Sequence, residues 1–182
     1  GHSFGGYTAY VTSGAPLSKD VLDEYCTAGQ QTACDVLSLW QAESPGATEI
    51  RLGDPRVWAA VGLAPWDAYA ILGSGMADIT VPILTLTGVE DVTTPLSMVQ
   101  GLVDAIDSAP NDFGKMKDVG HFSFSPIACQ TLTGDGCGDD FLDLETVMSL
   151  TNASVTAFLA DTLGWAGAEE QFPVVSEHID WE

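Results

Sequence analysis

The chain of 182 residues carries 26 Asp and Glu against five Lys and Arg, a formal net charge of −21, and 46% of its residues are hydrophobic. That hydrophobic share is enough for one folded domain with its own core and excludes a disordered chain. The negative charge argues against nucleic acid, anionic lipid and strongly anionic substrates as partners. No apolar run reaches the roughly 18 residues of a membrane span.

Local sequence patterns predict helices and strands that alternate along the chain. Small residues and helical spacing of apolar residues predict helices at 4–13, 18–25, 35–42, 95–108 and 140–163. Two apolar runs and one more polar run predict strands at 56–65, 81–91 and 113–121. Strands that alternate with helices are typical of the α/β class with a parallel sheet.

The predicted elements form one domain over residues 1–163, with an excursion or cap-like insertion at 15–55 and an acidic surface tail at 164–182. The sequence predicts three strands, and the first of them would have an open apolar edge. Four aspartates between Asp135 and Asp143 predict a solvated start of the last helix.

The four cysteines fall into two local pairs of equal spacing, Cys26 with Cys34 and Cys129 with Cys137. This spacing in loop-like sequence favours two local disulfides, each stabilising the fold by about 2–3 kcal/mol in the chain-entropy model. Disulfides indicate a secreted or extracytoplasmic protein. The alternatives are reduced buried thiols and metal binding, and the lack of a C-x-x-C motif disfavours metal.

The first five residues, Gly1 to Gly5, read G-x-S-x-G, the motif of a sharp strand-to-helix turn that exposes a nucleophilic serine, here Ser3. Asp91 and His121 each end a predicted strand. Because ligands bind beyond the carboxyl ends of strands in parallel α/β sheets, we expect these three residues to meet at one edge. Their order along the chain is that of the α/β-hydrolase triad.

This set of residues predicts nucleophilic catalysis. His121 would take the hydroxyl proton of Ser3 and later donate it to the leaving group. Asp91 would fix the tautomer of His121 and stabilise its charged form. The amide N–H of Phe4, directly after the nucleophile, would be one oxyanion donor.

Each candidate also has a structural interpretation. Ser3 could be an ordinary small residue in a glycine turn, and Asp91 could be a turn or helix-cap residue, with Glu90 or Asp118 as the acid instead. Trp66 follows a predicted strand end and could belong to the core, although its place at the functional edge favours a wall of the acyl pocket.

The stretch "GHSFGGYTAY" resembles the nucleophile turn of the platelet-activating-factor acetylhydrolase and dienelactone-hydrolase-like branch of the α/β-hydrolases. The segments "LAPWDAY", "ITVPILTLTGVEDVTTP" and "GHFSFSPIAC" are similar to bacterial cutinases and polyester hydrolases. The resemblance implies a cleft tryptophan at Trp66, an acid at Asp91 and a base at His121. We count His2 and Phe122, the sequence neighbours of the nucleophile and the base, among the substrate-binding residues.

The resemblance implies the C-terminal portion of an α/β-hydrolase fold, because family members have further strands and a second oxyanion donor before this turn. We therefore expect an N-terminal half, as a separate chain or as residues outside 1–182, or self-association of the chain. The sequence predicts a secreted serine carboxylic-ester hydrolase that forms an acyl-enzyme on a neutral ester, possible substrates including polyesters and aromatic esters, without metal or organic cofactor. The alternative is a non-catalytic hydrolase fragment that binds a partner chain through its open sheet edge.

Overall fold

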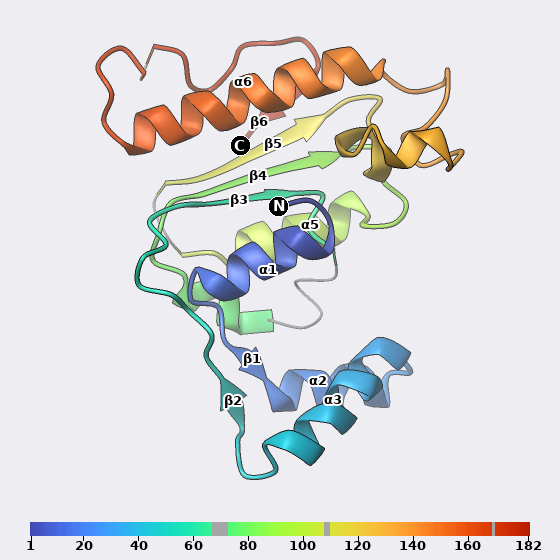
Figure 1. The fold of residues 1–182 in the computed structure, drawn as a ribbon, viewed down its shortest axis with the longest axis vertical. Helices are drawn as coiled ribbons and strands as arrows, with labels where there is room; N and C mark the ends of the chain where they lie inside the picture. The colour runs from blue at the N-terminus through green and yellow to red at the C-terminus, as the bar shows by residue number, and fades with distance from the viewer. Residues whose placement is uncertain (67–72, 108–109, 169) are drawn as a thin grey trace.

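The computed structural model describes residues 1–66, 73–107, 110–168 and 170–182. A four-stranded sheet with the strand order β3-β4-β5-β6 crosses its centre (Figure 1). β3, β4 and β5 are parallel, and β6 joins β5 antiparallel. The strands span Ala60–Leu63 (β3), Ile83–Gly88 (β4), Asn111–Met116 (β5) and Ile179–Trp181 (β6).

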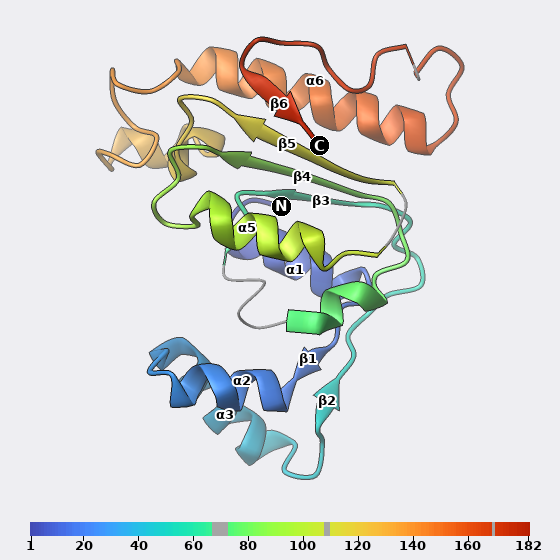
Figure 2. The same cartoon turned by 180° about the vertical axis from the view of Figure 1, so that it is seen from behind.

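Helices cover both faces of this sheet, as Figures 1 and 2 show from opposite sides. α6 (Leu144–Thr162) lies on one face, and α1 (Phe4–Thr12) and α5 (Leu96–Asp104) lie on the other. None of the helices in the described part of the chain is both long and apolar enough to cross a bilayer.

The core consists of two clusters of buried side chains, one on each face of the sheet. All six residues of β4 are buried, which fits an apolar strand with helices on both sides. The cluster under α1 and α5 includes Tyr10, Val99, Leu102, Ile83 and Phe113. The cluster under α6 includes Leu84, Leu86, Met116, Val147 and Phe158.

The predicted excursion at 15–55 is a pair of helices on a short two-stranded stem. The stem pairs β1 (Leu17–Ser18) with β2 (Glu49–Ile50), and between them run α2 (Lys19–Thr27) and α3 (Gln31–Glu43). A disulfide joins Cys26 to Cys34, whose Cα atoms lie 4.6 Å apart. Figure 1 shows this helical pair on the side of the molecule opposite α6.

The acidic tail runs over the surface, and its last residues also contribute the edge strand of the sheet, β6, which the sequence did not predict. The amide N–H of Phe113 donates to the carbonyl of Glu182 at 3.1 Å, and that of Lys117 to the carbonyl of His178 at 3.0 Å. Lys117 also pairs with Asp180 at 2.9 Å. Backbone pairing with β5 draws the tail into the sheet, although its composition is that of a solvated segment.

The first residues of the chain lie alongside β3, on the edge away from β4. His2 forms a parallel bridge with Leu63, and the N–H of Ser3 donates to the carbonyl of Leu63 at 2.9 Å. The Leu63 N–H in turn donates to the Gly1 carbonyl at 2.9 Å. Residues 1–3 therefore begin a strand beside β3 and turn directly into α1.

Candidate active site

Ser3 occupies a strained turn between this short extended segment and α1. Its φ and ψ angles are 56° and −123°, in a region that residues other than glycine rarely adopt. Such conformations cost about 1–3 kcal/mol and persist only where the surroundings hold them. Here the Ser3 carbonyl accepts from the amides of Gly6 at 2.9 Å and Trp66 at 3.0 Å. These contacts hold the backbone of Ser3 in this conformation.

The turn is packed so closely at Gly1 and Gly6 that a side chain at either position would crowd its neighbours. A Cβ atom on Gly1 would overlap the backbone of Gly5, and one on Gly6 would lie 3.1 Å from both the Gly1 carbonyl and Pro65. Gly5, the last glycine of the sequence motif, has open space where its Cβ would be. The motif thus marks the turn correctly, but only its first glycine is required by close packing.

Asp91 lies in the loop that follows β4, which we call the acid loop (residues 89–94). Asp91 is buried, with only 4% of the residue exposed. One oxygen accepts from the amide N–H of Thr94 at 2.5 Å, and the other accepts from the Thr94 hydroxyl at 2.6 Å. Thr94, itself fully buried, therefore holds both oxygens of the carboxylate in a fixed orientation. Nothing in the sequence motif pointed to this threonine.

His121 lies in the segment that follows β5, which we call the His loop (residues 119–124). Its Nδ1 lies 3.0 Å from Asp91 Oδ2 and its Nε2 lies 2.9 Å from Ser3 Oγ. A carboxylate only accepts hydrogen bonds, so Nδ1 carries the proton and Nε2 presents a lone pair to the serine. The structure thus brings Ser3, Asp91 and His121 together in the geometry that a serine nucleophile requires.

The alternative acids from the sequence do not contact the imidazole. Glu90 and Asp118 are both exposed, whereas His121 is 1% exposed and is paired with Asp91 inside the protein. The acid loop and the His loop meet where the Glu90 amide donates to the Val119 carbonyl at 3.0 Å. A Cβ on Gly88 would overlap this carbonyl. The absence of a side chain at Gly88 allows the acid loop and the His loop to approach this closely.

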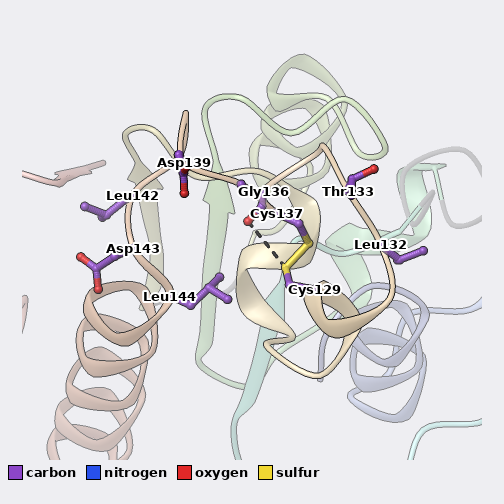
Figure 3. A pocket seen from close by; sticks show the side chains of 10 residues that line it. Cys129, Leu132, Thr133, Gly136, Cys137, Asp139, Leu142, Asp143 and Leu144 are labelled. Atoms are coloured by element: carbon purple, nitrogen blue, oxygen red, sulfur yellow. Dashed lines mark hydrogen bonds between the residues drawn. A yellow bond between two sulfur atoms is a disulfide. The ribbon is translucent and has the colours of Figure 1, made fainter.

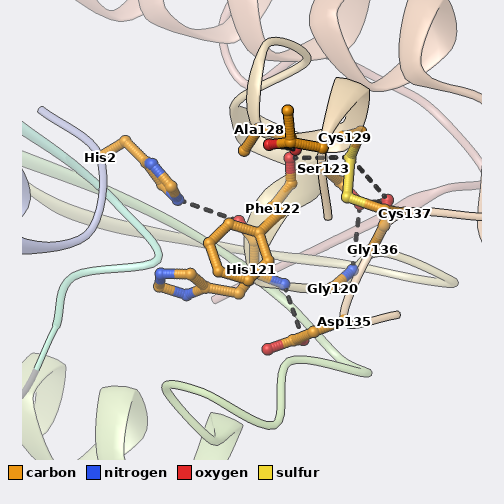
Figure 4. The surroundings of a disulfide bond; sticks show 11 residues. His2, Gly120, His121, Phe122, Ser123, Ala128, Cys129, Asp135, Gly136 and Cys137 are labelled. Carbon is orange, nitrogen blue, oxygen red and sulfur yellow. Dashed lines mark hydrogen bonds between the residues drawn. A yellow bond between two sulfur atoms is a disulfide. The ribbon is translucent and has the colours of Figure 1, made fainter. Parts of the chain in front are cut away.

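His2 links the nucleophile turn to the His loop. Its Nε2 donates to the His121 carbonyl at 2.9 Å, and the two imidazole rings lie 4.8 Å apart between centroids. Partial burial, followed by the nearby His121, lowers the pKa of His2, so the ring is kept neutral. Figure 4 shows this contact beside the His loop. The substrate-binding role predicted for His2 stays a prediction, since its Nε2 is already engaged.

A cluster of aromatic side chains lies at the start of α1, next to the nucleophile turn. The rings of Phe4 and Trp66 lie 5.9 Å apart, and those of Phe4 and Tyr7 lie 5.2 Å apart. Phe4 is 58% exposed, and burial raises the pKa of Tyr7 to about 12, so this surface is apolar and uncharged. In the His loop, the Phe122 ring meets the His121 ring edge-on at 5.0 Å. Trp66 therefore lies in the ring cluster at the nucleophile turn, and Phe122 lies against the candidate base.

The amide N–H of Phe4 is free to act as an oxyanion donor. At the start of α1, the amides of Gly5, Gly6 and Tyr7 donate to the carbonyls of His2 and Ser3. The Phe4 amide has no acceptor among residues 1–66, 73–107, 110–168 and 170–182. An unpaired N–H at a helix start favours negative charge beside it.

The second disulfide, Cys129–Cys137, closes a loop directly beside His121, as Figure 4 shows. Within this loop, Asp135 accepts hydrogen bonds from the acid loop and from the His loop. The prediction that Asp135 belongs to the solvated start of the last helix is wrong, because that helix is capped by Asp143, which accepts from Thr146 N–H at 2.9 Å. A Gly-Asp-Gly turn next to a cysteine was the available sequence signal.

Two comparisons with known proteins complete the description. Neither models of protein families nor curated protein sequences gave a match to this chain. Within the described residues, no group of three or more His, Cys, Asp and Glu side chains is placed to hold a metal ion.

Proposed function

We propose that the protein is a serine carboxylic-ester hydrolase of the α/β-hydrolase type that acts through an acyl-enzyme. The observation that carries this proposal is the continuous chain of contacts from Asp91 through His121 to Ser3, at 3.0 Å and 2.9 Å. It is supported by the strained backbone of Ser3 and by the burial of both Asp91 and His121. Strain and buried ionisable groups gather at functional sites more often than elsewhere.

The proposed reaction has two halves. The oxygen of Ser3 attacks the ester carbonyl while His121 Nε2 takes the hydroxyl proton, and the carbonyl electrons move onto an oxyanion beside the Phe4 N–H. The oxyanion collapses, the bond to the alcohol breaks, and His121 protonates the departing alcohol. Water then attacks the acyl-serine with His121 as base, and the acid leaves as Ser3 regains its proton. Asp91 stabilises the charged imidazole in both halves.

The surroundings of Ser3 favour a neutral ester with an apolar or aromatic acyl group. Phe4, Tyr7 and Trp66 supply flat apolar rings at the nucleophile turn, and the Phe122 ring packs edge-on against His121. The net charge of −21 disfavours anionic substrates, and it also favours departure of the carboxylate product.

A second oxyanion donor and an oxidising cellular compartment belong to the proposed function. The donor would come from polypeptide that lies against the β3 edge beside residues 1–3, in a longer form of the chain, in a separate chain or in a second copy. The disulfides Cys26–Cys34 and Cys129–Cys137 support a secreted or extracytoplasmic protein, because such bonds persist in oxidising compartments.

Labelling with an active-serine phosphonate tests the proposal. We expect covalent labelling of the folded protein, with the added mass on the peptide that contains Ser3 and none in the Ser3→Ala variant. The same preparation should hydrolyse a chromogenic ester. A folded protein that neither reacts with the probe nor turns over esters would support the alternative of a non-catalytic partner-binding fragment.

Trp66→Ala tests the class of ester. Loss of the indole should lower kcat/KM for an aromatic ester roughly 3- to 10-fold, because ring stacking contributes about 0.5–1.5 kcal/mol, and should leave an acetate ester nearly unchanged. The matched control is Trp165→Ala, an exposed tryptophan beyond the end of α6, which should change neither. Equal losses on both esters would make Trp66 a structural residue instead.

A further inference from the structure

Asp135 joins the two loops that carry the candidate acid and base. Its Oδ1 accepts from the amide N–H of His121 at 3.0 Å and from that of Val92 at 3.1 Å. Its Oδ2 accepts from the Thr93 amide at 3.0 Å and from the Thr93 hydroxyl. One carboxylate thus receives four donors, three of them backbone amides from segments far apart in the sequence.

The electrostatics of Asp135 fit this role. Partial burial alone would raise the pKa of its carboxyl group, but hydrogen bonds from His121, Thr93 and Val92 outweigh burial and hold the pKa below its ordinary value. The group is therefore ionised, and both oxygens act as acceptors at neutral pH.

The backbone around Asp135 is fitted tightly to the His loop. The Asp135 carbonyl accepts from the Phe122 amide at 2.8 Å, and the Gly136 carbonyl accepts from the Ser123 hydroxyl at 3.1 Å. A Cβ on Gly120 would overlap the backbone between Asp135 and Gly136. The turn therefore follows the backbone of the His loop at close range, as the labelled residues in Figure 4 show.

The Cys129–Cys137 disulfide lies at the end of the turn formed by residues 134–137. Gly134 and Cys137 pair with each other across the turn at 2.9 Å and 3.1 Å, and Cys137 is bonded to Cys129. On the α6 side of the disulfide lies a hollow of about 390 Å³, lined by Cys129, Gly136 and Cys137 and, across it, by Asp143 and Leu144 (Figure 3). Side chains of α6 do not fill this hollow, and on this side the turn is joined to Cys129 by the disulfide.

We propose that Asp135 is a positioning residue for the hydrolytic site, and that the Cys129–Cys137 disulfide keeps it in place. This inference rests on the proposed function. The carboxylate fixes the backbone of Val92 and Thr93 next to Asp91, and the backbone of His121 itself. Both ends of the Asp91–His121 hydrogen bond are thereby fixed to one anchor, which keeps the imidazole in line with Ser3.

Asp135→Asn tests the anchor. An asparagine oxygen can accept from only one of the two donor pairs, and its NH₂ group would face the other, so the two loops should separate. Since a misplacement of about 1 Å can cost on the order of 100-fold in rate, we expect kcat to fall by roughly 10- to 100-fold with little change in KM. The control Asp139→Asn, an exposed aspartate of the same segment, should match the wild type.

Amide hydrogen exchange provides a readout that does not depend on turnover. In Asp135→Asn, the amides of Val92, Thr93 and His121 should exchange faster, while those of β4 stay protected. If the chain proves inactive and unlabelled by the phosphonate, the proposed function fails, yet this exchange result still decides the anchor. Unchanged exchange at all three amides, or kcat equal to the wild type, would overturn the inference.

The other disulfide, Cys26–Cys34, provides a control for the proposed role of Cys129–Cys137 in keeping Asp135 in place. Each disulfide joins cysteines eight positions apart. Removing either one should therefore raise the conformational entropy of the unfolded chain by the same amount. Replacing Cys129 and Cys137 with alanine should lower kcat by roughly 10-fold or more and speed exchange at the His121 amide. Replacing Cys26 and Cys34, which lie in the helical excursion, should lower stability alone. Equal kcat in the two double variants would refute the role of the Cys129–Cys137 bond.

Discussion

Replacing Ser3 with alanine is expected to lower kcat for a chromogenic ester by on the order of 10⁶-fold, the loss seen when a serine nucleophile is removed from such a triad. The methyl group cannot form the acyl-enzyme, and His121 Nε2 loses the hydroxyl that lies 2.9 Å away. The fold should be unaffected, because the strained backbone of Ser3 is held by amides and carbonyls that alanine retains. Initial rates on matched protein concentrations, with the melting temperature of each variant, measure both effects.

Ser13→Ala is the matched control for this variant. Ser13 caps the other end of α1, where its hydroxyl donates to the Ala9 carbonyl at 2.7 Å, and it takes no part in the candidate site. Its kcat should equal that of the wild type. Turnover by Ser3→Ala above about 1% of the wild-type rate would show that another group attacks the ester, because the residual catalysis left by a lost nucleophile is far smaller.

Asp91→Asn is expected to lower kcat by roughly 10⁴-fold while the protein stays folded. The asparagine NH₂ group would donate to His121 Nδ1, which forces the imidazole proton onto Nε2. The base would then present an N–H to Ser3 and could not accept the hydroxyl proton. The Thr94 amide can still donate to the asparagine oxygen, whereas the Thr94 hydroxyl, which shares Oδ2 with His121 Nδ1, would face the NH₂ group; the acid loop therefore keeps part of its hydrogen bonding.

Glu90→Gln distinguishes this effect from a general change in charge. Glu90 is the exposed neighbour of Asp91 and, like it, loses one negative charge on substitution. Its kcat should stay at the wild-type value. A large loss in Glu90→Gln together with a small loss in Asp91→Asn would make Glu90 the acid and contradict the geometry of the site.

Several features of this protein follow from the sequence by itself. Apolar spacing predicted β4 near 81–91 and α6 near 140–163, because burial on both faces of a strand and on one face of a helix leaves a periodic trace. The equal spacing of the cysteines predicted both disulfides. The G-x-S-x-G motif and the positions of Asp91 and His121 after predicted strands predicted which side chains would meet, since parallel strands end at one edge.

The tertiary structure alone decided which polar loop residues support those side chains. Thr94 and Asp135 carry no periodic signal, and their partners are set by which loops meet in space, so they read as ordinary turn residues in the sequence. The same holds for the acidic tail, where β6 forms because the free edge of β5 offers unpaired backbone groups, whatever the local composition. Side-chain patterns report burial along one element, whereas hydrogen bonds between loops depend on the approach of segments that lie far apart in the chain.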